Sequence, residues 1–243
     1  MEYDQGKQVG LRYHELSHLE RTISDFENKA RAYHKGAEDS PENETPAQKK
    51  LREEKLKRDL KHLDRERRRA LCLIQVFTEL EKYRRDYTVN ASDSIENAEK
   101  KVSIMLEERH HPTKVLARFM LMVGRPRPSA RHTPHHIVLG KGKTKYSAEA
   151  RLNMHYLGIR INDPDNGVWM PMTKSDKGHW AMPDSPAHAE IHTHNYEEWV
   201  FESTFMHADE RTFRTELRRI RMLLKSGRQP RKVTEPVDRK RNT

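Results

Sequence analysis

Five polar side chains in the second half of the chain have the types and spacing of a metal-dependent hydrolytic site. His135 and His136 are adjacent, Asn166 opens an Asn-Gly turn, and His188 and His192 follow, four residues apart. A single histidine is often a satisfied core residue. Four histidines and an asparagine in this order instead predict a metal site held by a strand–strand–helix unit.

Hydrolysis of a phosphodiester is the chemistry that such a set would serve. The anionic backbone repels an incoming nucleophile, and the alkoxide that must depart is a poor leaving group. A divalent metal that binds a phosphate oxygen and the leaving oxygen answers both problems. A neutral imidazole can take the proton from water at physiological pH. The site therefore needs a few neutral ligands and one histidine that stays off the metal.

The two histidine pairs meet these needs differently. Successive side chains on a strand point to opposite faces, so His135 and His136 cannot easily bind the same ion. One becomes a ligand and the other stays free. Residues 186–192 suit the start of a helix, where His188 and His192 would project from one face and share a metal. His194 is the alternative to His188 if that helix begins later.

Three motifs in this order resemble the HNH/endonuclease VII superfamily. They are TPHHIVL at 133–139, NGVWMP at 166–171 and HAEIHTHNY at 188–196. The resemblance is strongest to the AHH branch, found largely among bacterial polymorphic toxins and secreted effectors, and it covers residues 130–203. Pro134 stands where the family has alanine, which is tolerable at the start of a strand.

The resemblance implies a role for each of the five residues. His135 would be the first metal ligand, and His188 and His192 would complete the metal site. His136 would be the general base that activates water. Asn166 would pin the loop between the two strands and so keep His136 oriented. Three imidazoles suit zinc, while members of the superfamily also work with magnesium, so the expected cofactor is a divalent ion, Mg or Zn.

The elements around these residues are predicted to be mostly helical. Apolar spacing indicates helices over about 7–35, 46–87, 95–106, 112–123, 147–157 and 208–225. The predicted fold class is α+β, mostly α: a long helical or coiled-coil region, a small ββα-metal nuclease domain, and a C-terminal basic helix and tail. With the boundary at the basic, proline-bearing segment 125–129, the predicted domains are 1–125, 130–205 and 206–243. The long charged helix permits a homodimer or an intramolecular hairpin with residues 7–35.

Composition restricts the partners and the setting. Charged residues make up 35% of the chain and the net charge is +10, which favours a polyanionic partner. The single cysteine, Cys72, excludes an intramolecular disulfide framework. No apolar run approaches the roughly 18 residues that span a bilayer. Because the N-terminus lacks a signal peptide, we expect a cytoplasmic protein, or one secreted into a target cell without a cleavable signal.

These observations lead to a ranked set of functions. The first is a metal-dependent endonuclease that hydrolyses DNA, with an antibacterial toxin or effector role and an inhibitor or immunity protein as a further partner. An RNA-cleaving nuclease of the same fold is the alternative within that class. A helical nucleic-acid-binding scaffold with a structural metal site is the alternative from another class, and such a site would have no use for His136.

Overall fold

The computed structural model describes residues 2–4, 7–9, 13–38, 43–90 and 92–235. The chain folds into two compact units, residues 1–78 and 79–243. In the second unit the helices predicted between residues 95 and 123 pack with the histidine-bearing segment. The three domains predicted from the sequence, 1–125, 130–205 and 206–243, stay a prediction.

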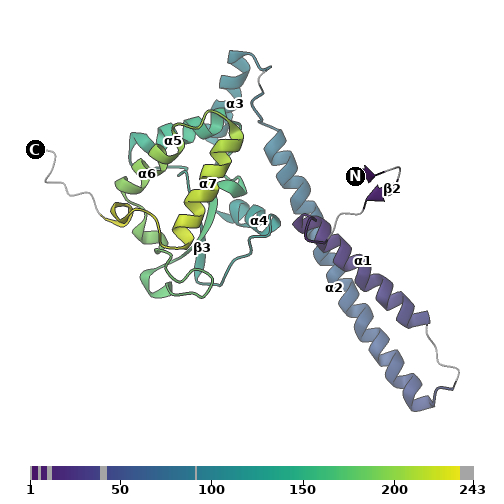
Figure 1. The fold of residues 1–243 in the computed structure, drawn as a ribbon. Coiled ribbons are helices and arrows are strands. Elements are labelled where there is room, and N and C mark those ends of the chain that lie inside the picture. The colour runs from purple at the N-terminus through teal and green to yellow at the C-terminus, as the bar shows by residue number, and fades with distance from the viewer. Residues whose placement is uncertain (1, 5–6, 10–12, 39–42, 91, 236–243) are drawn as a thin grey trace, which may run out of the picture. The chain divides into compact units, whose positions relative to one another are not determined.

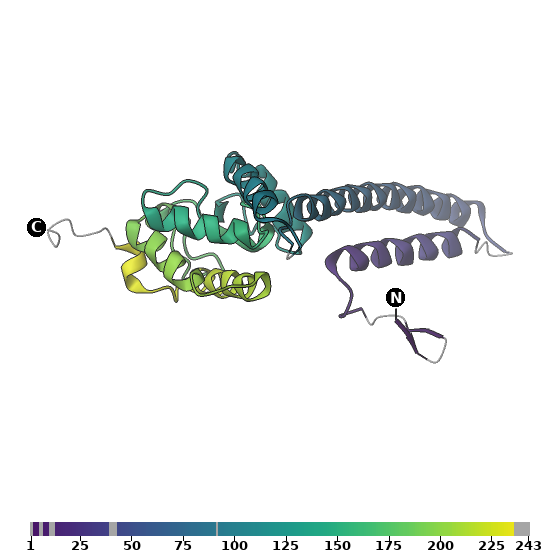
Figure 2. The ribbon, with the colours of Figure 1, turned by 90° about the horizontal axis from the view of Figure 1, so that it is seen from above.

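The first unit pairs two helices after a short hairpin. Strands β1 (Glu2–Asp4) and β2 (Lys7–Val9) are antiparallel, so the helix predicted from residue 7 begins only at His18. Helix α1 (His18–Glu38) lies antiparallel along α2 (Pro46–Arg85), as Figures 1 and 2 show. Lys29 Nζ lies 2.7 Å from Glu66 Oε2 between them. No residue of α1 is buried. The coiled-coil homodimer expected from the sequence stays a prediction.

The second unit is mostly helical around a two-stranded sheet. It contains the end of α2 and then α3 (Ile95–Glu107), α4 (Lys114–Met122), α5 (Lys145–Tyr156), α6 (His194–Thr204) and α7 (Glu210–Lys225). Ser94, Thr193 and Asp209 each accept a hydrogen bond from the backbone N–H three residues later, which fixes where α3, α6 and α7 begin. None of the described helices has the length and apolar character needed to cross a membrane.

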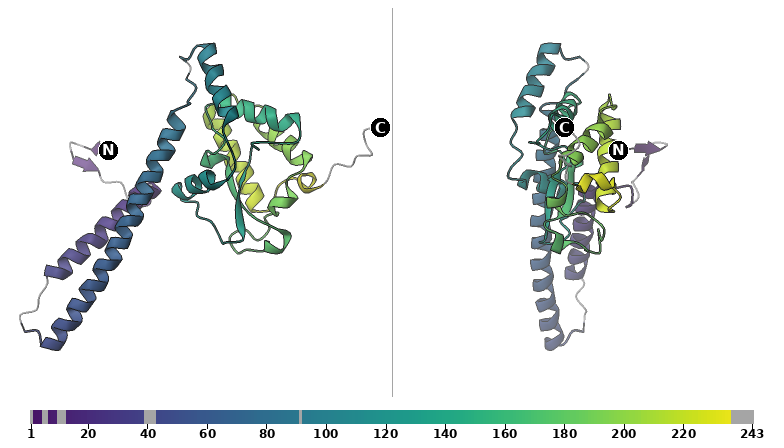
Figure 3. Two further views of the ribbon diagram at one scale, coloured as in Figure 1. Left: turned by 180° about the vertical axis from the view of Figure 1, so that it is seen from behind. Right: turned by 90° about the vertical axis from the view of Figure 1, so that its left-hand side faces the viewer.

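The sheet presents different residues to its two sides. Strand β3 (His132–His136) pairs antiparallel with β4 (Gly167–Pro171), and His136 lies opposite Gly167. Val168 and Met170 pack into the core formed with α6 and α7, whereas Trp169 packs on α4. Figure 3 shows the ribbon of this unit from two further sides. A Cβ on Gly167 would lie 2.6 Å from the sulfur of Met120, so glycine allows α4 to approach the strand.

The core confirms the apolar spacing of the last predicted helix. Four side chains of α7 are fully buried: Phe213, Leu217, Ile220 and Leu224. They pack with Met154 of α5, with Tyr196 and Trp199 of α6, and with the strand segment that follows β3. This core fixes α6 against the sheet, and it therefore also fixes the segment that carries His188 and His192.

A buried ion cluster holds the turn that leads into β4. Asp163 lies 2.9 Å from Arg84 of α2 and 3.0 Å from Arg214 of α7, and Asp165 pairs with Arg214 and with Arg125. Burial alone would raise the pKa of Asp163, but the two guanidiniums outweigh it and keep that pKa below its ordinary value. The cluster joins the last turn of α2 to this turn and to α7 within the second unit.

Candidate metal centre

Three histidines from separate local structures meet at one point. His135 comes from β3, His188 opens a 3-10 turn (His188–Glu190), and His192 lies just before α6. One ring nitrogen of each lies within 4.8 Å of the others. The residues predicted as metal ligands are therefore brought together. The two downstream histidines reach the site from a tight turn and not from the face of a regular helix. His194 starts α6 and lies outside this group.

Hydrogen bonding determines which nitrogen of His135 is available. The Tyr196 hydroxyl donates its only proton to the Ile137 carbonyl oxygen at 2.9 Å. His135 Nε2 lies 3.0 Å from the same hydroxyl oxygen and must therefore donate to it. The free lone pair of His135 is then on Nδ1. A buried imidazole with one nitrogen anchored and the other free is how protein metal ligands are commonly held.

The electrostatics of the cluster favour neutral imidazoles. Burial lowers the pKa of His135 well below its ordinary value, and the neighbouring His188 and His192 lower it further. Burial and His192 lower the pKa of His188 to about 4. Burial and then Lys143 lower the pKa of His192. All three imidazoles are therefore neutral at neutral pH, with His188 Nε2 and His192 Nε2 3.1 Å apart, and three neutral nitrogen donors fit a divalent transition ion such as zinc.

His136 lies beside this cluster but outside it. It faces a cavity of about 130 Å³ that His135, His188 and His192 also line. Its Nε2 lies 3.0 Å from Asn162 Oδ1. Burial lowers the pKa of His136, whereas the hydrogen bond to Asn162 raises it. The effect of burial is larger, and the pKa is about 4. The ring is therefore neutral at physiological pH and able to accept a proton.

Asn166 is buried and bonds only to the backbone around it. Its Oδ1 accepts from Val138 N at 2.7 Å, and its Nδ2 donates to the carbonyl oxygens of Val138 and Ile161 at 3.1 and 2.9 Å. These bonds join the segment after β3 to the segment before β4, which suits a residue that pins a loop. The side chain that touches the His136 ring is Asn162, which the sequence reasoning missed.

Two further histidines, His110 and His111, also line the cavity. The rings of His110 and His111 lie 6.1 and 6.4 Å from that of His136, measured between centroids. A Cβ on Gly140 would lie 2.2 Å from the His110 ring, so only glycine leaves room for that ring. In the sequence, the segment His110-His111-Pro112 was expected only to interrupt two helices. The signal that could have identified it as part of the site is that its two histidines are adjacent, like His135 and His136.

Two basic side chains near the cavity have structural partners. Arg151 donates to the carbonyl oxygens of Gly140 and Leu106, and so satisfies the C-terminal end of α3. Lys143 Nζ donates to the His192 carbonyl oxygen at 3.0 Å. Lys141 lines the cavity itself and is exposed.

The three-histidine cluster, with a separate neutral histidine beside it, lies within a part of the chain that matches a nuclease family of the HNH/endonuclease VII superfamily. Residues 116–232 match the family model described as AHH, a nuclease family of that superfamily with a conserved AHH motif. The resemblance predicted from the sequence is thereby confirmed for this part of the chain, which includes Pro134-His135-His136. No curated protein and no solved structure matches the chain significantly.

Proposed function

We propose that the protein is a metal-dependent endonuclease that hydrolyses DNA. In this proposal His135, His188 and His192 hold a divalent ion, Mg or Zn. The observation that carries the proposal is the convergence of their ring nitrogens within 4.8 Å beside the cavity that His136 also faces. A bound divalent ion would supply Lewis-acid stabilisation of the phosphate and of the leaving oxygen.

His136 is the proposed general base. It is neutral at physiological pH, it lies outside the ligand group, and it borders the cavity in which a phosphate would sit. It can take the proton from an attacking water. Asn166 supports this arrangement by fixing the backbone that follows His136. Together β3, β4 and α6 would then form the ββα-metal unit of the nuclease.

The substrate and the setting extend this proposal. The net charge of +10 suits a nucleic acid, with DNA as the proposed substrate. The family context favours a toxin or effector that is neutralised by an inhibitor or immunity protein. The helical residues 1–125 would then serve delivery, dimerisation or docking.

The test combines cleavage with metal content. The full chain is incubated with plasmid DNA and with RNA, in Mg²⁺ or Zn²⁺, with and without EDTA. We expect DNA cleavage that EDTA abolishes. His136→Ala should lose most of its cleavage and keep its metal, His192→Ala should lose both, and His194→Ala is the matched control that should lose neither. Cleavage of DNA by His136→Ala at the wild-type rate would refute the assignment of the base. Cleavage of RNA alone would change the substrate.

A further inference from the structure

The side chain that holds His136 is itself fixed by groups that precede the family-matched domain. Asn162 Nδ2 donates to Glu108 Oε1 at 2.9 Å and to the Arg109 carbonyl oxygen at 3.1 Å. Both partners can only accept hydrogen bonds. The amide therefore has one orientation, with Oδ1 turned toward His136. Glu108 and Arg109 lie outside the matched range, 116–232.

The orientation of Asn162 decides the tautomer of His136. Asn162 Oδ1 only accepts, so His136 Nε2 must carry the ring proton. The lone pair of the neutral ring is then on Nδ1, which has no hydrogen-bond partner among the described residues. Without Asn162 the ring could turn or change tautomer, and the lone pair would no longer be fixed on Nδ1.

Both carboxylate oxygens of Glu108 have hydrogen-bond donors of their own. Its Oε1 accepts from the Tyr83 hydroxyl at 2.6 Å, and its Oε2 accepts from Arg160 Nε at 2.8 Å. The Arg160 guanidinium lies 3.8 Å from the centre of the Tyr83 ring. The Tyr83 hydroxyl also accepts from Asn162 N at 2.9 Å, so Asn162 is fixed through its backbone and its side chain. Burial, followed by the charge of Glu108, raises the pKa of Tyr83 and keeps its hydroxyl protonated.

We propose that Asn162 is the positioning residue of His136, and that Glu108 and Tyr83 hold Asn162 in place. The end of α2 and the segment after α3 would therefore be parts of the nuclease site, although they precede the matched domain. This inference rests on the proposed role of His136 as the base. It adds that the active tautomer is set by a carboxylate–amide–imidazole chain whose first member lies outside that domain.

The first experiment measures cleavage by the full chain. Asn162→Ala should lower kcat by about 10- to 100-fold, the range found for residues that orient a reacting or ligating group, with KM and metal content unchanged. In a His136→Ala background the same substitution should have no further effect, because Asn162 acts through His136. Asn153→Ala is the matched control, since the Asn153 amide bonds only to the Thr204 carbonyl oxygen and its loss should leave kcat unchanged.

Two results would overturn the inference. One is wild-type kcat in Asn162→Ala. The other is an equal loss of residual activity in the His136→Ala background, which would indicate a general effect on folding. Glu108→Ala should repeat the Asn162→Ala phenotype more weakly, and Glu108→Gln, which keeps an acceptor for Asn162, should retain more activity than Glu108→Ala. The opposite order would also contradict the proposal.

A second readout does not depend on activity. In the metal-free, ¹⁵N-labelled protein, long-range ¹H–¹⁵N correlations report which nitrogen of each histidine carries the proton. The His136 ring should be the Nε2–H tautomer in the wild type and a mixture in Asn162→Ala. A mixture in the wild type would refute the positioning role even if the protein is a nuclease. A single Nε2–H tautomer in a protein that cleaves nothing would instead refute the proposed function alone.

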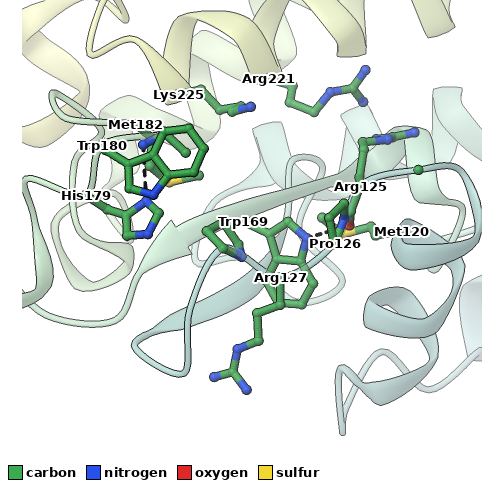
Figure 4. Close-up of a pocket in the computed structure, with 13 residues that line it drawn as sticks. Met120, Arg125, Pro126, Arg127, Trp169, His179, Trp180, Met182, Arg221 and Lys225 are labelled. Carbon is green, nitrogen blue, oxygen red and sulfur yellow. Dashed lines mark hydrogen bonds between the residues drawn. The ribbon is translucent and has the colours of Figure 1, made fainter. Parts of the chain in front are cut away.

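A different observation points to a binding surface for the substrate. A pocket of about 360 Å³ lies between α4, β4 and α7, apart from the histidine cavity, and Figure 4 shows its lining. Trp169 and Met182 are part of its apolar lining. Trp180, which also lines it, is 87% exposed, the highest fraction among the large hydrophobic side chains of the described residues. Arg127, Arg221 and Lys225 also line it, and no acidic side chain is among the described residues that do.

We infer that this pocket, the Trp180 pocket, binds one unpaired nucleotide of a nucleic-acid strand. An exposed indole offers a face on which any base can stack. Lys225 has no ion-pair partner among the described residues, and its charge matches a backbone phosphate. The inference rests on the proposed nuclease function, since it requires a nucleic-acid substrate.

The test measures binding without cleavage. A fluorescently labelled single-stranded DNA of about 12 nucleotides is titrated with the full chain in EDTA. Trp180→Ala and Lys225→Ala should each weaken binding about 5- to 10-fold, and Phe205→Ala, which removes another exposed aromatic side chain, should not. Wild-type affinity in Trp180→Ala would refute the pocket and leave the nuclease assignment intact. An absence of binding by the wild type would count against both.

Discussion

Replacing Asn166 with alanine should destabilise the second unit strongly. The side chain is fully buried and makes three hydrogen bonds to backbone groups: the Val138 N–H, the Val138 carbonyl and the Ile161 carbonyl. Alanine leaves all three groups unpaired in a region that water does not reach. At about 1 to 2 kcal/mol for each orphaned group, the loss is about 3 to 6 kcal/mol. That is a large part of the stability of an ordinary domain.

Urea unfolding followed by circular dichroism measures this loss. The midpoint for Asn166→Ala should fall with little change in the slope, because the surface exposed on unfolding stays similar. Asn153→Ala, which removes one side-chain bond to the Thr204 carbonyl, is the comparison and should cost about 1 kcal/mol. A loss below about 1 kcal/mol for Asn166→Ala would refute the account of Asn166 as the pin between the two strand segments.

Three further outcomes test other parts of the structure. His188→Ala should bind Zn²⁺ at least tenfold more weakly than wild type in a competition titration with a chromophoric chelator, because one of three ligands is lost; unchanged affinity would remove His188 from the site. Burial lowers the pKa of His155 to about 4, below the ordinary 6.5, so the unfolded chain takes up the proton first as the pH falls. The free energy of unfolding should therefore decline between pH 6.5 and 4, and His155 should account for about 3 kcal/mol of that decline. Denaturant titrations of His155→Gln at several pH values should show a decline that is smaller by this amount. Gly140→Ala should displace the His110 ring and cost about 1 to 3 kcal/mol of unfolding free energy, whereas an unchanged midpoint would show that the ring moves freely.

Local patterns in the sequence were sufficient for most elements. The apolar spacing of α7 predicted its buried face, and the order of the histidine motifs predicted the family. The prediction that His188 and His192 project from one face of a helix was wrong. Residues 188–190 form a 3-10 turn, and the next helix begins only at His194, where Thr193 caps it. The spacing of four residues brings the two rings together in either structure, which is why the pairing itself was predictable.

The residues around His136 were beyond such reasoning. Asn162 lies 26 residues from His136 in sequence, and Glu108 lies 54 residues from Asn162. Nothing in their neighbourhood has a periodicity that predicts contact, because the pairing depends on how α3 and the end of α2 pack in three dimensions. Asn166, in contrast, was found through its Asn-Gly pair, which is a local signal. The predicted turn itself is absent from these described residues, because Asn166 ends a 3-10 turn (Pro164–Asn166) and Gly167 is the extended first residue of β4.

The three candidate ligands differ in their access to solvent, and this difference has a kinetic consequence. His135 is buried, His188 is half-buried and His192 is exposed. An incoming ion would meet His192 first and His135 last, and a departing ion would leave in the reverse order. Exchange of the ion would therefore depend on how readily the exposed imidazole swings away. A chelator should remove the ion quickly by attacking from that side, without any opening of the core.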